Sequence, residues 1–155
     1  MVDFARSDRE LELEARTQAF IRNVIIPAER DPRQTTHGPA PEFVAELRSK
    51  ARAAGLLAPQ VAERWGGYGL THRETATVLR ASGYSLLGPV AMNCMAPDEG
   101  NMHLLDVVAT EAQKIQYLAP LAAGEIRSAF LMTEPDGGAG SDPDMLATTA
   151  RAVGS

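Results

Sequence analysis

Apolar residues of helix-favouring types dominate this 155-residue sequence. The chain contains 25 Ala, 15 Leu and 6 Met, which together make 46, against 14 Val and Ile combined. Ala, Leu and Met lose little side-chain freedom in a helix, whereas β-branched residues fit the pleated surface of a sheet. We therefore expect a mainly α fold whose length suits about one domain.

Helix-start signals recur along the first 120 residues. Three capping boxes are present, at Ser7-x-x-Glu10, Thr71-x-x-Glu74 and Thr110-x-x-Gln113. In each, a hydroxyl and an acid or amide side chain satisfy backbone amides that the first turn leaves free. Pro41 suits the start of another helix, because it lacks an amide hydrogen, and Gly55 is placed to end it. These signals predict a compact bundle of short helices.

Prolines mark the expected helix ends. Pro27 should end the first helix near Ile26, and Pro120 should stop the short helix that begins after Thr110. A proline inside a helix loses one hydrogen bond and clashes with the preceding turn. The Gly-Pro pair at 88–89 is likewise expected to interrupt the chain.

The pattern changes after Gly124. Residues 126–133 have no helical period and end at Glu134-Pro135, which predicts a strand entering a tight loop; residues 145–153 are a second candidate strand. We therefore divide the chain into a helical domain at 1–125 and the incomplete beginning of a β-domain at 126–155. The expected architecture is a helical bundle followed by the first strand or strands of a truncated β-domain.

Charge and composition exclude several classes. The net charge of −5 argues against nonspecific nucleic-acid binding, and no apolar run approaches the ~20 residues that span a bilayer. The acidic N-terminus resembles neither a secretory signal nor a mitochondrial transit peptide. The single cysteine, Cys94, cannot form an internal disulfide, so we expect a cytoplasmic protein with this side chain packed in the core. The three histidines lack metal-site spacing, and we expect no metal.

The loop at 136–143 carries the strongest chemical signal. Its three glycines allow the backbone to approach a ligand, and Thr133 and Ser141 supply hydroxyls beside it. Phe130 and Met132 offer apolar contact to a flat ring. Four carboxylates, at 134, 136, 142 and 144, would repel a phosphate. The loop therefore suits polar, largely uncharged ligand atoms, with a plain glycine-rich turn as the alternative interpretation.

Four segments resemble one family. Residues 130–135 read FLMTEP and residues 140–142 read GSD, which is similar to the TEP and GSD segment of the acyl-CoA dehydrogenases, flavoenzymes that desaturate acyl thioesters. Residues 63–70 (ERWGGYGL), 110–114 (TEAQK) and 117–121 (YLAPL) resemble further family segments in the same order. The loop after Pro135 is two residues longer than the family's common TEPGAGS.

The resemblance implies an FAD site. It implies that Phe130, Leu131, Met132 and Thr133 line the flavin ring, and that Gly138 and Gly140 permit a close approach. Ser141 would lie between the flavin and the acyl-CoA substrate. The family's glutamate base would fall beyond this chain, so no catalytic residue is assigned and we expect the chain alone to be inactive. The full-length enzyme would use an electron-transfer acceptor and form a homodimer or homotetramer.

Three functions remain open at this point. The first is the N-terminal part of an FAD-dependent acyl-CoA dehydrogenase, which contributes one wall of the flavin and acyl-CoA site. The second is a non-catalytic helical interaction module or the remnant of a truncated gene, in which an unpaired strand at 128–133 would seek a partner edge. The third is a free-standing flavin or nucleotide binder that uses the glycine-rich loop.

Overall fold

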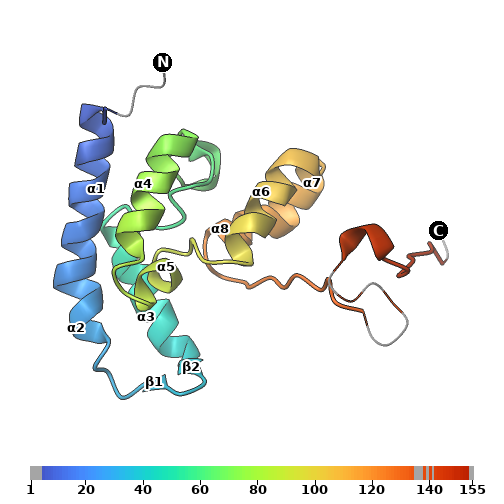
Figure 1. Ribbon diagram of the computed structural model, residues 1–155, viewed down its shortest axis with the longest axis horizontal. Coiled ribbons are helices and arrows are strands. Elements are labelled where there is room, and N and C mark those ends of the chain that lie inside the picture. Colours follow the sequence, from blue (N-terminus) through green and yellow to red (C-terminus); the bar gives the residue numbers. More distant parts are fainter. Residues whose placement is uncertain (1–4, 135–137, 139, 141, 154–155) are drawn as a thin grey trace.

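The computed structural model describes residues 5–134, 138, 140 and 142–153, and it is mainly helical (Figure 1). Its elements follow in this order: α1 (Asp8–Phe20), a π-helical turn (Ile21–Ile25), α2 (Ile26–Ala28), β1 (Gln34–Thr35), β2 (Gly38–Pro39), α3 (Pro41–Ala53), a 3₁₀ turn (Glu63–Trp65), α4 (His72–Ser82), α5 (Leu87–Ala91), α6 (Asp98–Val108), α7 (Glu111–Gln113), a second π-helical turn (Lys114–Leu118), α8 (Ala119–Ala122) and a last 3₁₀ turn (Pro143–Met145).

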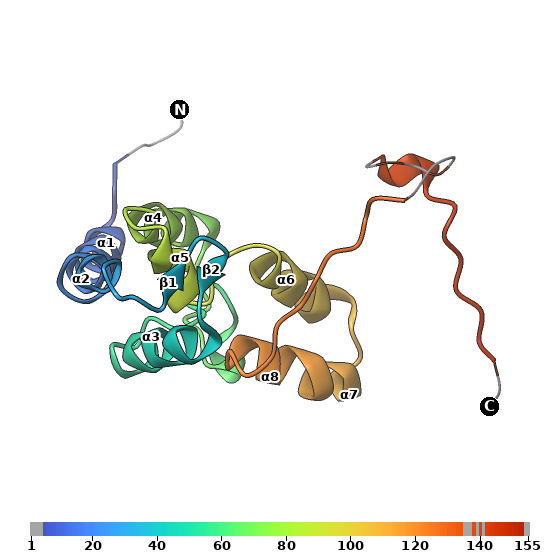
Figure 2. The ribbon, with the colours of Figure 1, turned by 90° about the horizontal axis from the view of Figure 1, so that it is seen from below.

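The helices form a bundle with a chain segment leading away from it. Helix α1 packs along α4, α3 packs on α5, and α6 packs with the second π-helical turn and α8 (Figures 1 and 2). β1 and β2 form a small antiparallel hairpin between α2 and α3, with Gln34 opposite Pro39. The largest apolar side chains that lie fully buried come from most of these elements: Ile21, Ile25, Phe43, Leu47, Leu56, Leu87, Met92, Met102, Leu118 and Leu121.

All three predicted capping boxes are confirmed, and so is the start of α3 at Pro41. The predicted end of α3 is confirmed as well, because Gly55 follows its cap with φ of +63°. The Gly55 amide donates to the Arg52 carbonyl at 2.9 Å and the Leu56 amide to the Ala51 carbonyl at 2.8 Å. This pair of bonds satisfies carbonyls that the last turn leaves free.

The expected helix ends at the two prolines are wrong. The first helical run continues past Pro27 to Ala28, and the later run continues past Pro120 to Ala122. In both, a π-helical turn directly precedes the residue before proline: the Ile26 amide bonds to the Ile21 carbonyl, and the Ala119 amide to the Lys114 carbonyl. The wider turn relieves the clash that a proline ring makes in a regular α-helix.

The expected interruption at 88–89 is also wrong, because Gly88 and Pro89 lie inside α5. Pro89 is in the first turn of α5, where its missing amide hydrogen costs nothing. A Cβ on Gly88 would lie 2.0 Å from the Ser82 carbonyl oxygen and 2.9 Å from Ile21 Cδ1. Glycine is therefore present at position 88 because α5 packs closely against the end of α4.

The strand predicted at 126–133 does not form within the described residues. The chain there is extended, but it has no ladder partner, and residues 146–153 are likewise extended without pairing. A strand needs the backbone groups of a neighbour, and the helices beside this segment offer none. In the described part of the chain, no helix has both the length and the apolar character needed to cross a membrane.

Candidate functional site

The extended segment after α8 carries the residues predicted to line a flavin. It leaves the bundle at Gly124, passes α6 and ends near the last 3₁₀ turn (Figure 2). Phe130 is 64% exposed and Leu131 is 93% exposed, while Met132 is half-buried and Thr133 is exposed. The segment therefore presents a row of apolar side chains that ends in a hydroxyl.

Asp98, the first residue of α6, holds the start of this segment. Asp98 is only 2% exposed, and its carboxylate accepts hydrogen bonds from the Ser128 amide at 2.8 Å and the Ser128 hydroxyl at 2.7 Å. The Arg127 guanidinium donates a further bond to it. Burial alone would raise the pKa of Asp98, but the hydrogen bonds from Ser128 and Arg127 outweigh that effect and lower the pKa. The carboxylate is therefore ionised at neutral pH.

A buried arginine lies behind this contact. Arg48 of α3 donates to the Gly124 carbonyl at 2.9 Å, and its Nη2 lies 3.9 Å from Asp98 Oδ2. Burial lowers the pKa of Arg48, and Arg127 adds to that shift while Asp98 opposes it. The point at which the chain leaves the bundle is thus fixed by charged groups from α3 and α6.

Beyond Thr133, Glu134 forms hydrogen bonds with residues later in the chain. Its amide donates to the Gly140 carbonyl at 3.0 Å, and its carboxylate accepts the amides of Ala147 at 3.1 Å and Thr148 at 2.6 Å. One of the four carboxylates expected to repel a phosphate is therefore bound to backbone amides of this chain. Gly140 has φ of +58°, and a Cβ there would meet nothing within 4 Å, so its backbone faces open space. Gly138 is half-buried, and Ser141 lies outside the described residues.

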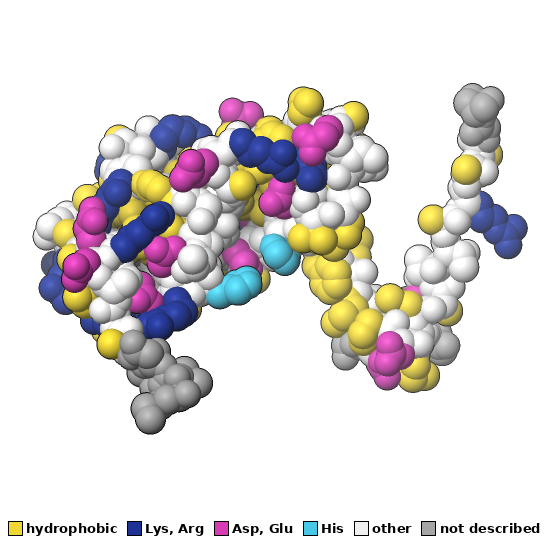
Figure 3. Space-filling view, turned by 90° about the horizontal axis from the view of Figure 1, so that it is seen from above, with side chains coloured by type: hydrophobic (Ala, Val, Ile, Leu, Met, Phe, Trp, Pro, Cys, Tyr) yellow, Lys and Arg dark blue, Asp and Glu magenta, His cyan; other side chains and the backbone are white. Residues whose placement is uncertain are grey.

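An apolar groove lies directly beside the segment. We call it the α6 groove; its volume is about 590 Å³, and Phe130 forms one border. Its floor is formed by the outer face of α6 and the turn before it: Ala96, Pro97, Gly100, Asn101, Leu104 and Val107. Figure 3 shows the apolar surface running from this part of the bundle onto the extended segment. Sequence reasoning missed the groove, although Leu104 and Val107 share a helical face with Gly100.

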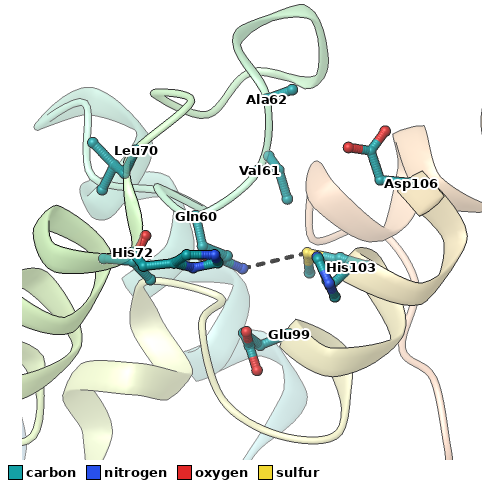
Figure 4. Close-up of a pocket in the computed structure, with 10 residues that line it drawn as sticks. Gln60, Val61, Ala62, Leu70, His72, Glu99, His103 and Asp106 are labelled. Atoms are coloured by element: carbon teal, nitrogen blue, oxygen red, sulfur yellow. Dashed lines mark hydrogen bonds between the residues drawn. The ribbon is translucent and has the colours of Figure 1, made fainter.

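A second, more polar cavity of about 320 Å³ lies on the adjacent face of α6. Gln60 and His72 line one side, and Glu99, His103 and Asp106 of α6 line the other (Figure 4). Glu99 and His103 also border the α6 groove. These two side chains thus lie between the two cavities. Among the residues that the structure describes, no group of three or more His, Cys, Asp or Glu side chains is arranged to hold a metal ion.

Comparison with known proteins identifies the family. The family model described as acyl-CoA dehydrogenase, N-terminal domain, matches residues 7–125. The chain is 38% identical over 160 residues to "Probable acyl-CoA dehydrogenase FadE2" of Mycobacterium tuberculosis, an alignment that covers 96% of this chain and 37% of that protein. It is 32% identical over 163 residues to acyl-CoA dehydrogenase family member 11 of Rattus norvegicus, covering 98% of this chain and 20% of that protein.

A solved structure agrees with the sequence comparisons. It comes from Mycobacterium abscessus, is assigned to the acyl-CoA dehydrogenases, and superposes with a TM-score of 0.76 at 38% identity. The alignment covers 91% of this chain and 38% of that one. The chain therefore spans less than two fifths of the length of each of these three proteins. The fold, the family match and the relatives agree that this chain belongs to the acyl-CoA dehydrogenase family.

Proposed function

We propose that this chain is the N-terminal part of an FAD-dependent acyl-CoA dehydrogenase and supplies one wall of its flavin and acyl-CoA site. One observation carries the proposal: the exposed apolar row that begins at Phe130 lies directly beside the apolar α6 groove. Family membership supports the oxidoreductase class. In this proposal residues 1–125 are the helical domain and residues 126–155 begin the β-domain, with the boundary just after the helices end at Ala122.

The residues present fit a flavin. Phe130, Leu131 and Met132 offer apolar surface to a flat ring system, and the Thr133 hydroxyl can both donate and accept at its polar edge. The bare backbone at Gly140 leaves room for a close approach, and we assign the same role to Gly138. Ser141 completes the proposed set. When bound, FAD supplies the two-electron acceptor, and the chain contributes position and polarity.

The α6 groove fits the hydrocarbon part of an acyl thioester. Its volume of about 590 Å³ lies within the usual range for small-molecule sites, and its floor is made of Leu104, Val107 and neighbouring small residues. Phe130 belongs both to this groove and to the flavin-facing row, so the two ligands would meet at its ring. The side chains of this wall bind and orient the substrate and exclude water from it.

The remaining parts of the proposal concern the longer polypeptide. We assign the catalytic base to residues outside this chain, and we name no catalytic residue within it. The whole enzyme would pass electrons to an electron-transfer acceptor, form a homodimer or homotetramer, and act in the cytoplasm.

A chimaera tests this function. The chain would replace the matching 37% of the Mycobacterium tuberculosis relative, and the purified product would be assayed for bound flavin and for bleaching of the flavin by octanoyl-CoA. Thr133→Val removes the hydroxyl at nearly constant shape, and Thr149→Val, in the exposed stretch near the C-terminus, is the matched control. We expect Thr133→Val to weaken flavin retention about tenfold, as loss of one hydrogen bond in a dry site does, and the control to change nothing. A folded chimaera without flavin, or equal effects of both variants, would refute the proposal.

A further inference from the structure

Asp98 begins α6 and also binds the extended segment that follows α8. A carboxylate at the first position of α6 is favoured by the helix dipole, and yet it is turned toward the chain that follows α8. It receives both donors of Ser128, the backbone amide and the hydroxyl, which fixes that residue in position and in orientation. At 2% exposure the group is shielded from water, so these bonds are not weakened by solvent competition.

Asn101, one turn further along α6, adds a second contact. Its Nδ2 donates to the Ser128 hydroxyl oxygen at 2.9 Å and to the Ala129 carbonyl at 3.4 Å. Within the described residues, no hydrogen bond joins 130–133 to the helices, so Ala129 is the last residue held in this way before the flavin-facing row. Asn101 also lines the α6 groove. The same turn of α6 therefore borders the groove and holds the segment.

We propose that Asp98, assisted by Asn101, is the positioning residue that sets where the segment 130–133 lies relative to the α6 groove. The inference rests on the proposed function for its purpose, because it is the flavin-facing row that is positioned. Asp98 touches no substrate or cofactor in this scheme. It acts through Ser128, with Arg48 holding the carboxylate from behind.

Spin labels measure the position directly. One label is attached to the bundle at Leu86→Cys and the other to the segment at Leu131→Cys, so the distance between them reports the position of the segment. The two native side chains are 89% and 93% exposed, and their replacement should be tolerated. Cys94 stays unlabelled, because it is buried and burial raises the pKa of its thiol to about 11. The distance distribution between the labels is expected to be narrow in the otherwise unsubstituted chain.

The variants separate positioning from stability. Asp98→Asn places an amide donor against the Arg127 donor, and it should broaden the distribution. Ser128→Ala and Asn101→Ala should broaden it as well while leaving the carboxylate beside Arg48, so they carry the test if Asp98→Asn fails to fold. Ser128→Thr keeps both donors and should restore the narrow distribution. Asp144→Asn, an exposed carboxylate removed from the contact, is the charge-matched control and should change nothing.

Trypsin gives a second measurement on the same chain. Cleavage after Arg127 requires its side chain to leave Asp98, whereas Arg151 is exposed throughout and serves as the internal reference. Release of the contact should speed cleavage at Arg127 relative to Arg151 about tenfold, which corresponds to ~1.4 kcal/mol. A helical melt that stays unchanged in Ser128→Ala shows that the bundle itself is intact.

The proposal is overturned by a distribution that is already broad in the unsubstituted chain, or by one that stays narrow in folded Asn101→Ala and Ser128→Ala. Neither FAD nor acyl-CoA is present in these measurements. Their failure would therefore remove the positioning role and leave the proposed function standing. Failure of the chimaera to hold flavin would remove the proposed function and leave the measured position of the segment standing.

Discussion

Replacement by alanine should have effects of different size at two adjacent glycines, Gly66 and Gly67. Gly66 has φ of +90°, and a Cβ there would meet nothing within 4 Å. A Cβ on Gly67 would lie 2.1 Å from the Val61 carbonyl oxygen and 2.7 Å from that of Ala58. Gly66→Ala therefore carries only a backbone cost, whereas Gly67→Ala is a steric clash with two backbone groups.

The magnitude follows from what would have to move. The Val61 carbonyl accepts the Gly69 amide at 3.1 Å, and the Ala58 carbonyl accepts the Val61 amide at 3.2 Å, so shifting them strains two hydrogen bonds. Overpacking costs about 1–3 kcal/mol and each weakened bond about 1 kcal/mol. We expect Gly67→Ala to lower the free energy of unfolding by about 3 kcal/mol. Gly66→Ala should cost about 1 kcal/mol, the penalty for a left-handed residue with a Cβ.

Circular dichroism melts and urea titrations of both variants test this difference. For a chain of this size, about 3 kcal/mol lowers Tm by roughly 6–12 °C and about 1 kcal/mol by roughly 2–4 °C. Because the two glycines are adjacent in the same turn, each variant serves as the control for the other. A Gly67→Ala chain as stable as the original, or a Gly66→Ala chain less stable than Gly67→Ala, would refute the steric reasoning.

Three further predictions concern single side chains. Thr71→Ala removes the hydroxyl that accepts the Glu74 amide, and should lower the urea midpoint by the equivalent of about 1 kcal/mol; an unchanged midpoint would contradict the cap. Arg48→Met removes the buried cation that donates to the Gly124 carbonyl and lies 3.9 Å from Asp98, which keeps its bond from Arg127; the change should cost about 2 kcal/mol in the same assay, and an unchanged midpoint would count against this role of Arg48. Because burial raises the pKa of Cys94 from 9.0 to about 11, a thiol reagent at pH 8 should react at least about 100-fold more slowly in the folded chain than in urea, and equal rates would disprove burial.

Local signals predicted most of the bundle. Each capping box and the Gly55 helix end depend on residues within one or two turns, so their outcome does not require knowledge of the rest of the fold. The predictions that helices end at Pro27 and Pro120 failed for a reason that is also local in the sequence. A proline disfavours a regular α-helical turn before it. In both places a wider, π-helical turn precedes the proline, and the helix continues past it.

Features that depend on distant residues were not predictable in this way. One border of the α6 groove is Phe130, which lies 26 residues after Leu104 in the sequence and follows α8. The groove therefore depends on how the chain after α8 passes α6. The role of Asp98 depends on Ser128, 30 residues further along the chain. The strand at 126–133 had the correct composition, but pairing also requires an adjacent strand edge, which the described residues do not provide. That residues 130–133 contact a flavin stays a prediction.

A titration of the isolated chain with FAD, followed residue by residue through amide chemical shifts, tests directly whether this chain supplies a wall of the flavin site. We expect weak, saturable binding with shifts concentrated at Phe130–Thr133 and at the α6 residues that border the groove, and a second set of groove shifts on adding octanoyl-CoA. Saturable shifts confined to another face, such as that between α1 and α4, or no shift at Phe130–Thr133 at any FAD concentration, would contradict it.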